Sequence, residues 1–394
     1  MNFRIDWSGR AIDYTNDELK TIIDVAKTAD PLTQGKYLAR FEEKIKDYLG
    51  VDNAFGLTSA ASALELIAVL SGVGPGDEVI IPSHTYCASA IPFGRTGAKI
   101  VWADINPSTF VISPEDIQRK ITKKTKLVVV VHLYGLMCDM AQIVEICKDN
   151  NLILVEDCAQ AFGAEYNHKK AGTFGDYSCF SFHAQKNITT LGEGGVLIVK
   201  DKKKAKYVPG LRHNGHCSYG ERSYYWKPAM GDVDLDIEGV WPFNFSMSEV
   251  QAALGEKLID RLDELNNQRI TRGRYFIEEL SKYPELVFQE TICNRQNVYH
   301  LLPAIYKGSQ HGKSNDDLIE LLSNKYKIKA IVQYYPLNRY PLFIKMGFSN
   351  SDCPNADYFF DNMISFPFHH WMSEDDFRYI VSSTKSALNQ LRGI

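Results

Sequence analysis

The chain has 394 residues, more than a single compact core usually serves, so its length predicts two domains. Hydrophobic residues make up 45% and charged residues 23% of the sequence, and the 21 Tyr and 20 Phe argue against a disordered chain. The formal net charge is −4, with acidic and basic residues well mixed. This balance excludes the strongly basic surface of a nucleic-acid-binding protein.

Cysteine usage and the N-terminus indicate the compartment. The eight Cys form no CxxC pair and no zinc-like spacing, so we expect reduced thiols and no disulfide framework. The first residues, "MNFRIDWSGR", lack the apolar run of a signal peptide, and no stretch reaches the apolar length of a membrane span. We therefore expect a cytoplasmic protein with no membrane partner.

Helical and strand patterns alternate along the first part of the chain. Two amphipathic helices are predicted over 15–28 and 37–50. Strands are predicted over 53–58, 77–82, 98–104, 126–135 and 152–157, with helices over 60–72, from about 87, after 113–116 and over 139–150. Apolar, β-branched runs that alternate with helices are typical of a parallel sheet buried on both faces. The sequence therefore predicts an α/β fold.

The pattern changes after Ser246. A long helical stretch over 246–282 leads to a predicted strand over 298–306, and further helices are predicted over 314–325 and 373–391. This order is typical of a smaller α+β domain. We predict a large α/β domain over residues 1–250 and a small C-terminal α+β domain over 251–394.

Two residues stand out as candidates for chemistry. Asp157 ends the strand "LILVED", and ligands of such sheets bind at the carboxyl ends of strands. By itself this acid could equally be a helix cap. Lys186, in "SFHAQKNITTLGEGG" (181–195), follows another apolar run and could by itself be a surface cation. Together they supply an amine that forms a Schiff base and an acid that holds a protonated pyridine nitrogen, the two requirements of pyridoxal phosphate (PLP) chemistry.

Other residues could hold the phosphate and the ring of that cofactor. The segment "LTSAASAL" (57–64) runs from strand into helix with small side chains, which suits a phosphate but also tight packing. Tyr86, in "SHTYCAS", could stack on a planar ring or belong to the core. The short cluster "HNGHC" (213–217) has no partner ligands elsewhere, so we expect no metal site.

Long, ordered motifs give the sequence a family resemblance. The stretches that carry it are "EDCAQAFGAEY" (156–166), "AGTFGDYSCFSFHAQKNITTLGEGGVLI" (171–198), "GKYLARFEEKIKDYLG", "GVGPGDEVIIPSHTY", "KLVVVVHLYG" and "NFSMSEVQAALG". They resemble the DegT/StrS family of sugar aminotransferases. The resemblance implies the type I fold of PLP-dependent transferases, with a large, mostly parallel sheet domain, a smaller C-terminal α+β domain and a homodimer that shares its active sites.

The resemblance also assigns roles to single residues. Lys186 would be the Schiff-base lysine and proton carrier, Asp157 would pair with the pyridine nitrogen, and Gln160 would approach the ring hydroxyl. Tyr86 would stack on the ring. The phosphate would be bound by Ser181 and by the main chain of Ser59, Ala60 and Ala61, with Asn244 reaching it from the other subunit.

The sequence departs from the family pattern at three places. Family members often have Gly-Thr where this chain has Ala60 and Ala61, so a phosphate-binding hydroxyl is missing unless Ser59 or Ser62 replaces it. Gln333 and Asn338 stand where relatives commonly have His. The segment "SFPFHHWM" (365–372), which includes His369, is richer in His and aromatic residues than usual. Gln333, Asn338 and His369 are therefore the candidate substrate-binding residues.

The resemblance favours one reaction class over others. Relatives with His at the lysine position act as dehydratases, so Lys186 implies transamination. The first hypothesis is amino transfer from L-glutamate, or glutamine, to the ketone of a nucleotide-linked keto-deoxysugar, for polysaccharide or glycoconjugate synthesis. The alternative is the same chemistry on a smaller ketone, such as a cyclitol ketone or a triose phosphate like dihydroxyacetone phosphate. A PLP-binding regulator without turnover and a binding module without a cofactor are the hypotheses from other classes.

Overall fold

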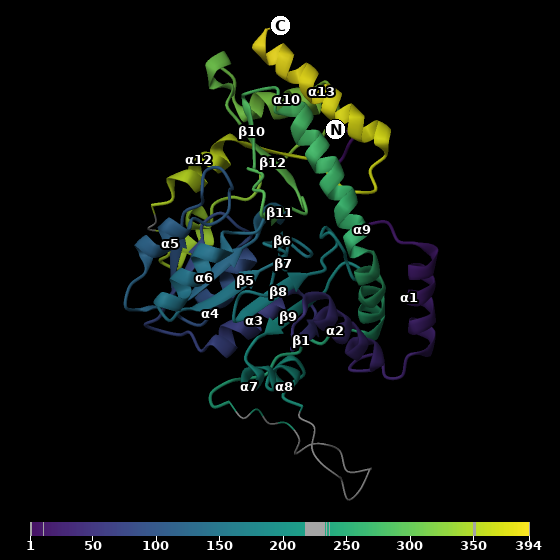
Figure 1. Ribbon diagram of the computed structural model, residues 1–394, viewed down its shortest axis with the longest axis vertical. Coiled ribbons are helices and arrows are strands. Elements are labelled where there is room, and N and C mark those ends of the chain that lie inside the picture. The colour runs from purple at the N-terminus through teal and green to yellow at the C-terminus, as the bar shows by residue number, and fades with distance from the viewer. Residues whose placement is uncertain are drawn as a thin grey trace, which may run out of the picture.

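A seven-stranded sheet forms the centre of the molecule. The computed structural model describes residues 2–10, 12–216, 233, 235, 237–349 and 352–393, and Figure 1 shows its arrangement. The strand order is β1-β9-β8-β5-β4-β2-β3. The strands are β1 (Ala54–Leu57), β2 (Glu78–Pro82), β3 (Lys99–Ala103), β4 (Thr125–Val131), β5 (Ile153–Asp157), β8 (Tyr177–Ser181) and β9 (Gly195–Val199).

The sheet is mostly parallel, as predicted. Strand β2 is parallel to β3 and β4, β4 to β5, and β5 to β8, whereas β9 is antiparallel to both β1 and β8. The strand predicted over 126–135 was too long, because β4 ends at Val131. Tyr134 (φ 64°) and Gly135 (φ 102°) turn the chain into the short helix η2 (Leu133–Gly135).

Helices connect and cover these strands. They are α1 (Asn16–Thr28), α2 (Lys36–Leu49), α3 (Ala60–Ser71), η1 (Cys87–Ser89), α4 (Ile91–Arg95), α5 (Pro114–Lys120), α6 (Met140–Asp149), α7 (Lys202–Ala205) and α8 (Val208–Arg212). Helix α3 packs on β8 and β9, α5 on β3, and α6 on β5. Among the described residues, no helix combines the length and the apolar character needed to cross a membrane.

One long helix, α9 (Glu249–Leu280), links two hydrophobic cores and confirms the helical prediction over 246–282. In Figure 1 it runs from beside α1 and α2 to α13 (Glu374–Arg392). Side chains up to Leu265 pack in the core of the sheet, and those from Ile270 onward pack in a second core. The change of core therefore falls inside one continuous helix, and the division into domains at residue 250 stays a prediction.

The second core lies under a small antiparallel sheet. Its strand order is β10-β12-β13. The strand predicted over 298–306 was too long, because β12 begins at Leu302. The remaining elements are β6 (Glu165–Tyr166), β7 (Lys169–Lys170), β10 (Leu286–Phe288), β11 (Arg295–Gln296), β12 (Leu302–Tyr306), β13 (Met363–Phe366), η3 (Gly308–His311), η4 (Leu337–Arg339), α10 (Asn315–Asn324), α11 (Pro341–Lys345) and α12 (Pro354–Asn362). Helices α10 and α13 confirm the predictions over 314–325 and 373–391.

A single glycine brings helix α3 against the end of the sheet. Gly195 of β9 pairs with Leu57 of β1 on one side and with Ser181 of β8 on the other. A Cβ atom on Gly195 would lie 2.2 Å from the carbonyl carbon of Ser59 and 2.4 Å from the amide nitrogen of Ala60. Because both neighbours are main-chain atoms, only glycine allows the start of α3 to lie beside Ser181.

Replacing this glycine should separate the helix from the sheet. We expect Gly195→Ala to lower the free energy of unfolding by about 3 kcal/mol, because backbone must move to admit the methyl group. Urea unfolding measures this change. Gly74→Ala is the matched control, since a Cβ there meets only the carbonyl oxygen of Thr96 at 3.9 Å, and we expect a change within about 0.5 kcal/mol. Equal effects of the two substitutions would contradict the packing argument.

Candidate active site

Asp157 lies at the carboxyl end of β5 and is held in one orientation. Its side chain is buried, and Oδ2 accepts a hydrogen bond from Oγ of Ser89 at 2.7 Å. Its Oδ1 accepts a hydrogen bond from the amide of Ala159 at 3.0 Å. Sequence reasoning missed Ser89, although it belongs to the same "HTYCAS" segment as Tyr86. Two fixed donors hold the carboxylate at the edge where ligands of parallel sheets bind.

Lys186 is on the loop that follows β8 and faces the same site. Burial lowers the pKa of its ammonium group from 10.5 to about 8, while the nearby charge of Asp157 acts in the opposite direction. Among the described residues, its Nζ has no hydrogen-bond partner. A fraction of the amine is therefore neutral near neutral pH, which a nucleophilic amine requires.

The pocket around Lys186 is built from distant parts of the chain. Its wall is lined by Trp7, Ser8, Arg10, Gln185, Lys186, Arg269, His300, Leu301, Gln333, Tyr334, Phe368 and His369. Of the three predicted substrate residues, Gln333 and His369 are in this wall. Asn338 is not in this wall; it is buried in η4, and its Oδ1 has no hydrogen-bond partner in the part of the chain that the structure describes. Roles in substrate binding stay predictions for all three residues.

Gln160 and Tyr86 both contact Tyr334, a residue of the pocket wall. The side chain of Gln160 is buried, with Oε1 accepting from the amide of Tyr134 at 2.7 Å and Nε2 donating to the hydroxyl of Tyr334 at 3.0 Å. The exposed ring of Tyr86 stands edge-on to the ring of Tyr334, with 6.0 Å between centroids. Sequence reasoning missed Tyr334, although it directly follows Gln333 in the sequence.

The predicted phosphate-binding residues gather at one edge of the sheet. Ser181 ends β8, and Gly195 places it beside the first turn of α3, which contains Ala60 and Ala61. The hydroxyl of Ser59 caps this helix by accepting from the amide of Ser62 at 3.0 Å. The hydroxyl of Ser62 is buried and already bonded to Ser59 and Thr58. The hydroxyl of Ser59 also has two bonds, but Ser59 is only half-buried, so it is the better candidate to replace the missing hydroxyl.

Asn244 lies outside the pocket of its own chain. It is exposed, and its backbone forms an antiparallel bridge with His213. The neighbouring Trp241 is 86% exposed. The predicted role of Asn244 in the site of another subunit stays a prediction.

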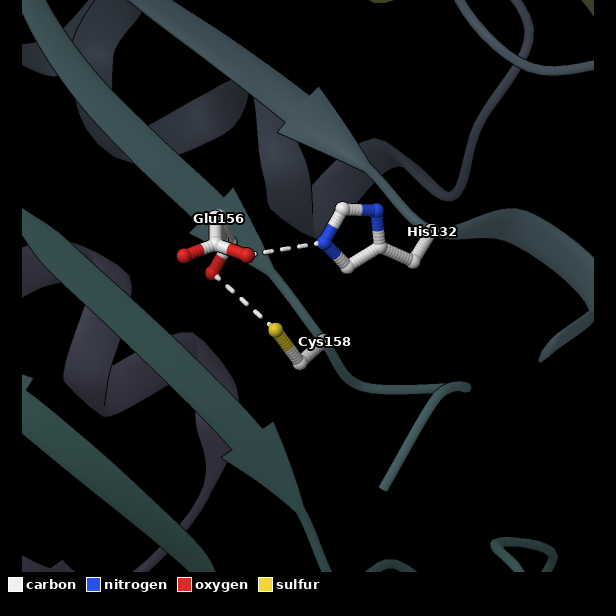
Figure 2. Close-up of side chains that lie close together, drawn as sticks. All are labelled: His132, Glu156 and Cys158. Carbon is white, nitrogen blue, oxygen red and sulfur yellow. Dashed lines mark hydrogen bonds and ion pairs between the residues drawn. The ribbon is translucent and has the colours of Figure 1, made fainter. Parts of the chain in front are cut away.

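A buried group of possible metal ligands lies on the other face of β5 (Figure 2). His132, Glu156 and Cys158 present ligand atoms within 4.8 Å of one another. The carboxylate of Glu156 already accepts four hydrogen bonds, from Nε2 of His132 at 3.0 Å and from the amides of Gly172, Phe174 and Gly175 at 3.0, 2.7 and 2.7 Å. Nδ1 of His132 accepts from the amide of Cys138 at 3.2 Å. With these lone pairs engaged, the group fixes the loop 172–175 and does not suit a metal ion.

The metal motif considered from sequence lies only partly within the described residues. The rings of His213 and His216 have centroids 5.1 Å apart, and Nδ1 of His213 lies 3.1 Å from the hydroxyl of Ser246. Cys217, the third member of "HNGHC", lies outside the described residues.

The residues present fit pyridoxal phosphate. The neutral amine of Lys186 can condense with an aldehyde, and the carboxylate of Asp157 can keep a ring nitrogen protonated. The bound cofactor supplies an electron sink for the breaking of a C–H bond. Nζ of Lys186 would take up that proton and return it, while Ser89 and the amide of Ala159 would keep the carboxylate of Asp157 in one orientation.

A lysine of lowered pKa near a buried aspartate, on a mostly parallel α/β sheet, is the arrangement that a PLP-dependent enzyme requires. The sequence model of the DegT/DnrJ/EryC1/StrS aminotransferase family matches residues 13–385, and the chain belongs to this family. It is a PLP-dependent aminotransferase, which confirms the predicted fold, enzyme class and cofactor.

Three known proteins illustrate the relationship. The chain is 31% identical to a GDP-perosamine synthase of Caulobacter vibrioides, over 90% of this chain and 91% of the relative. It is 32% identical to an L-glutamine:2-deoxy-scyllo-inosose aminotransferase of Streptomyces kanamyceticus, over 77% of this chain and 70% of the relative. A putative sugar aminotransferase of Streptococcus pneumoniae, solved in its PMP form, superposes with a TM-score of 0.85 at 26% identity, covering 98% of this chain and all of that one.

The lowered pKa of Lys186 predicts a pH dependence. Below a pH of about 8, the neutral fraction of the amine falls as pH falls, about tenfold per pH unit. We expect the rate at which the cofactor-free protein takes up PLP to level off above pH 8, whereas the rate of a small-molecule lysine amine should keep rising up to about pH 10.5. Lys186→Ala should abolish the reaction, and the exposed Lys203→Ala should not change it. A midpoint near the ordinary lysine value of 10.5 would contradict the assignment.

Proposed function

We propose that this aminotransferase moves an amino group from L-glutamate, or glutamine, to the ketone of a nucleotide-linked keto-deoxysugar. The product would enter polysaccharide or glycoconjugate synthesis. The observation that supports this most directly is the 31% identity to a GDP-perosamine synthase over 90% of the chain. The Lys186–Asp157 pair supplies the transamination chemistry that such a reaction needs.

The pocket wall has the polarity of a sugar-binding site. Gln333, His369 and His300 offer hydrogen-bonding groups beside Lys186. Arg10 is exposed at the pocket, where its guanidinium lies 5.2 Å from the ring centroid of Trp371 and forms an exposed ion pair with Asp13 at 3.3 Å. A cation in this position suits the phosphate groups of a nucleotide-linked substrate.

A smaller carbohydrate ketone is the second candidate acceptor. The 32% identity to an aminotransferase that acts on 2-deoxy-scyllo-inosose, a cyclitol ketone, favours this alternative. Gln333 also favours this alternative, because it occupies a position in the pocket wall where relatives commonly have His. A change in the pocket wall would alter which acceptor fits without altering the chemistry at Lys186.

The proposal includes a homodimer whose subunits share their active sites. Tyr86 and Trp241 are 56% and 86% exposed, and a second subunit would cover these two rings. Asn244 is exposed on the same segment as Trp241 and would serve the site of the other subunit. The mass of the protein in solution distinguishes a dimer from a monomer. A cytoplasmic location stays a prediction from the sequence.

Amines that correspond to the candidate products test the acceptor, because transamination is reversible. We expect a nucleotide-linked amino sugar such as GDP-perosamine to discharge the absorbance band of the bound cofactor at least about tenfold more efficiently than the amine of 2-deoxy-scyllo-inosose. L-Glutamate should also discharge it, and the Lys186→Ala variant should respond to none of these amines. A response confined to amines without a nucleotide would contradict the proposal in favour of the smaller acceptor.

A further inference from the structure

His300 is a buried histidine of the pocket wall to which the family resemblance assigns no role in binding the cofactor. It is 4% exposed, and its Nδ1 lies 3.1 Å from Oδ1 of Asn187, the residue next to Lys186. Its Nε2 has no hydrogen-bond partner within the described part of the chain. The side chain lines the pocket beside Lys186, Gln333 and His369.

A chain of amide groups determines which nitrogen of His300 carries the proton. Nδ2 of Asn266 donates to the carbonyl oxygen of Phe162 at 2.9 Å, so Oδ1 of Asn266 is the acceptor for Nδ2 of Asn187 at 3.0 Å. Nδ2 of Asn187 also lies 3.5 Å from the carbonyl oxygen of Val298. Oδ1 of Asn187 must therefore face His300, and a carbonyl oxygen can only accept. Nδ1 of His300 carries the hydrogen, which leaves a lone pair on Nε2.

The surroundings keep this imidazole neutral and immobile. Burial, and then the positive charges of Lys186, Arg269 and His183, hold the pKa of His300 well below its usual range. Arg269 donates from Nε to the carbonyl oxygen of Tyr299 at 3.0 Å and from Nη2 to that of His300 at 2.6 Å. Gly135 packs closely against the main chain of His300, since a Cβ on Gly135 would lie 2.9 Å from the amide nitrogen of His300. Nε2 is a fixed hydrogen-bond acceptor.

We propose that His300 binds the amino acceptor, with its unprotonated Nε2 accepting a hydrogen bond from a hydroxyl group near the ketone. A hydroxylated sugar or cyclitol brings a donor to this position. A glutamate carboxylate has only acceptor oxygens, which an imidazole lone pair repels. His300 therefore acts on the acceptor half of the reaction and not on the donor half. The inference rests on the proposed function only in requiring a hydroxylated ketone.

Two substitutions separate the two nitrogens of the ring. In His300→Asn the side-chain NH₂ can keep the bond to Asn187 while the acceptor at the Nε2 position is lost. In His300→Gln the terminal oxygen can occupy that position. With GDP-perosamine as the probe, we expect kcat/KM for discharge of the cofactor band to fall at least about tenfold in His300→Asn and to recover in part in His300→Gln. With L-glutamate, both variants should stay within about twofold of the wild type.

Three results would overturn the role. The first is an equal loss of kcat/KM with glutamate and with GDP-perosamine, which would indicate a structural effect on Lys186. The second is no loss of kcat/KM with either amine. The third is a His300→Gln variant that is no more active with GDP-perosamine than His300→Asn. If GDP-perosamine fails with the wild-type protein, the amine of 2-deoxy-scyllo-inosose is used in the same comparison. Failure of both amines with the wild type would count against the proposed function and against acceptor binding by His300.

A second measurement is independent of the sugar. In the cofactor-loaded protein with ¹⁵N-labelled histidine, the signals lost in His300→Asn belong to His300. We expect them to report a neutral ring with hydrogen on Nδ1 and a bare Nε2 throughout the range from about pH 6 to pH 9. Hydrogen on Nε2 would overturn the proposal whether or not the proposed function holds, because the atom that faces the pocket would then be a donor.

Discussion

The site depends on how the amine of Lys186 is enclosed near the carboxylate of Asp157. Burial disfavours the ammonium form and the carboxylate favours it, and burial has the larger effect, so the pKa falls to about 8. If the charge of Asp157 had the larger effect, the lysine would form an ordinary ion pair and would be a poor nucleophile. The fixed hydrogen bonds from Ser89 and Ala159 engage both oxygens of the carboxylate and hold it in the orientation in which we expect it to pair with the ring nitrogen of the cofactor.

Glu156 and Asp157, the last two residues of β5, have different surroundings because the side chains of a strand alternate between the two faces of the sheet. Glu156 points away from the pocket, where its hydrogen bonds to His132 and the loop 172–175 keep its pKa below the usual range in spite of burial. Asp157 points toward Ser89 and Lys186. The first acid fixes the strand ends that position the second. Glycine contributes in the same way at Gly195, where the absence of a side chain brings the start of α3 to Ser181.

Sequence alone predicted the parts of this structure that repeat or are local. Apolar, β-branched runs predicted the parallel sheet, and Lys186 and Asp157 stood out at the ends of such runs. The ends of β4 and β12 could not be predicted, because a turn at Tyr134 and contacts of Arg269 with Tyr299 and His300 decide them. These interactions join residues that are far apart in the chain or depend on an unusual backbone angle.

The wall of the pocket was the least predictable part of the site. Trp7, Tyr334 and His300 come from three segments with no local pattern that indicates a shared pocket. His300 appears in the sequence only as part of a predicted strand, and its significance depends on Asn187 and Asn266 in other elements. The residues expected to carry the chemistry of the family therefore lie in local motifs, whereas tertiary contacts bring together the residues proposed to bind the acceptor.

Borohydride reduction of the cofactor-loaded protein, followed by peptide mapping, tests the central claim most directly. The account predicts that the yellow chromophore of the purified protein disappears and that the pyridoxyl group is found on the peptide that contains Lys186. A colourless protein after incubation with PLP, or a label on any other lysine, would contradict it.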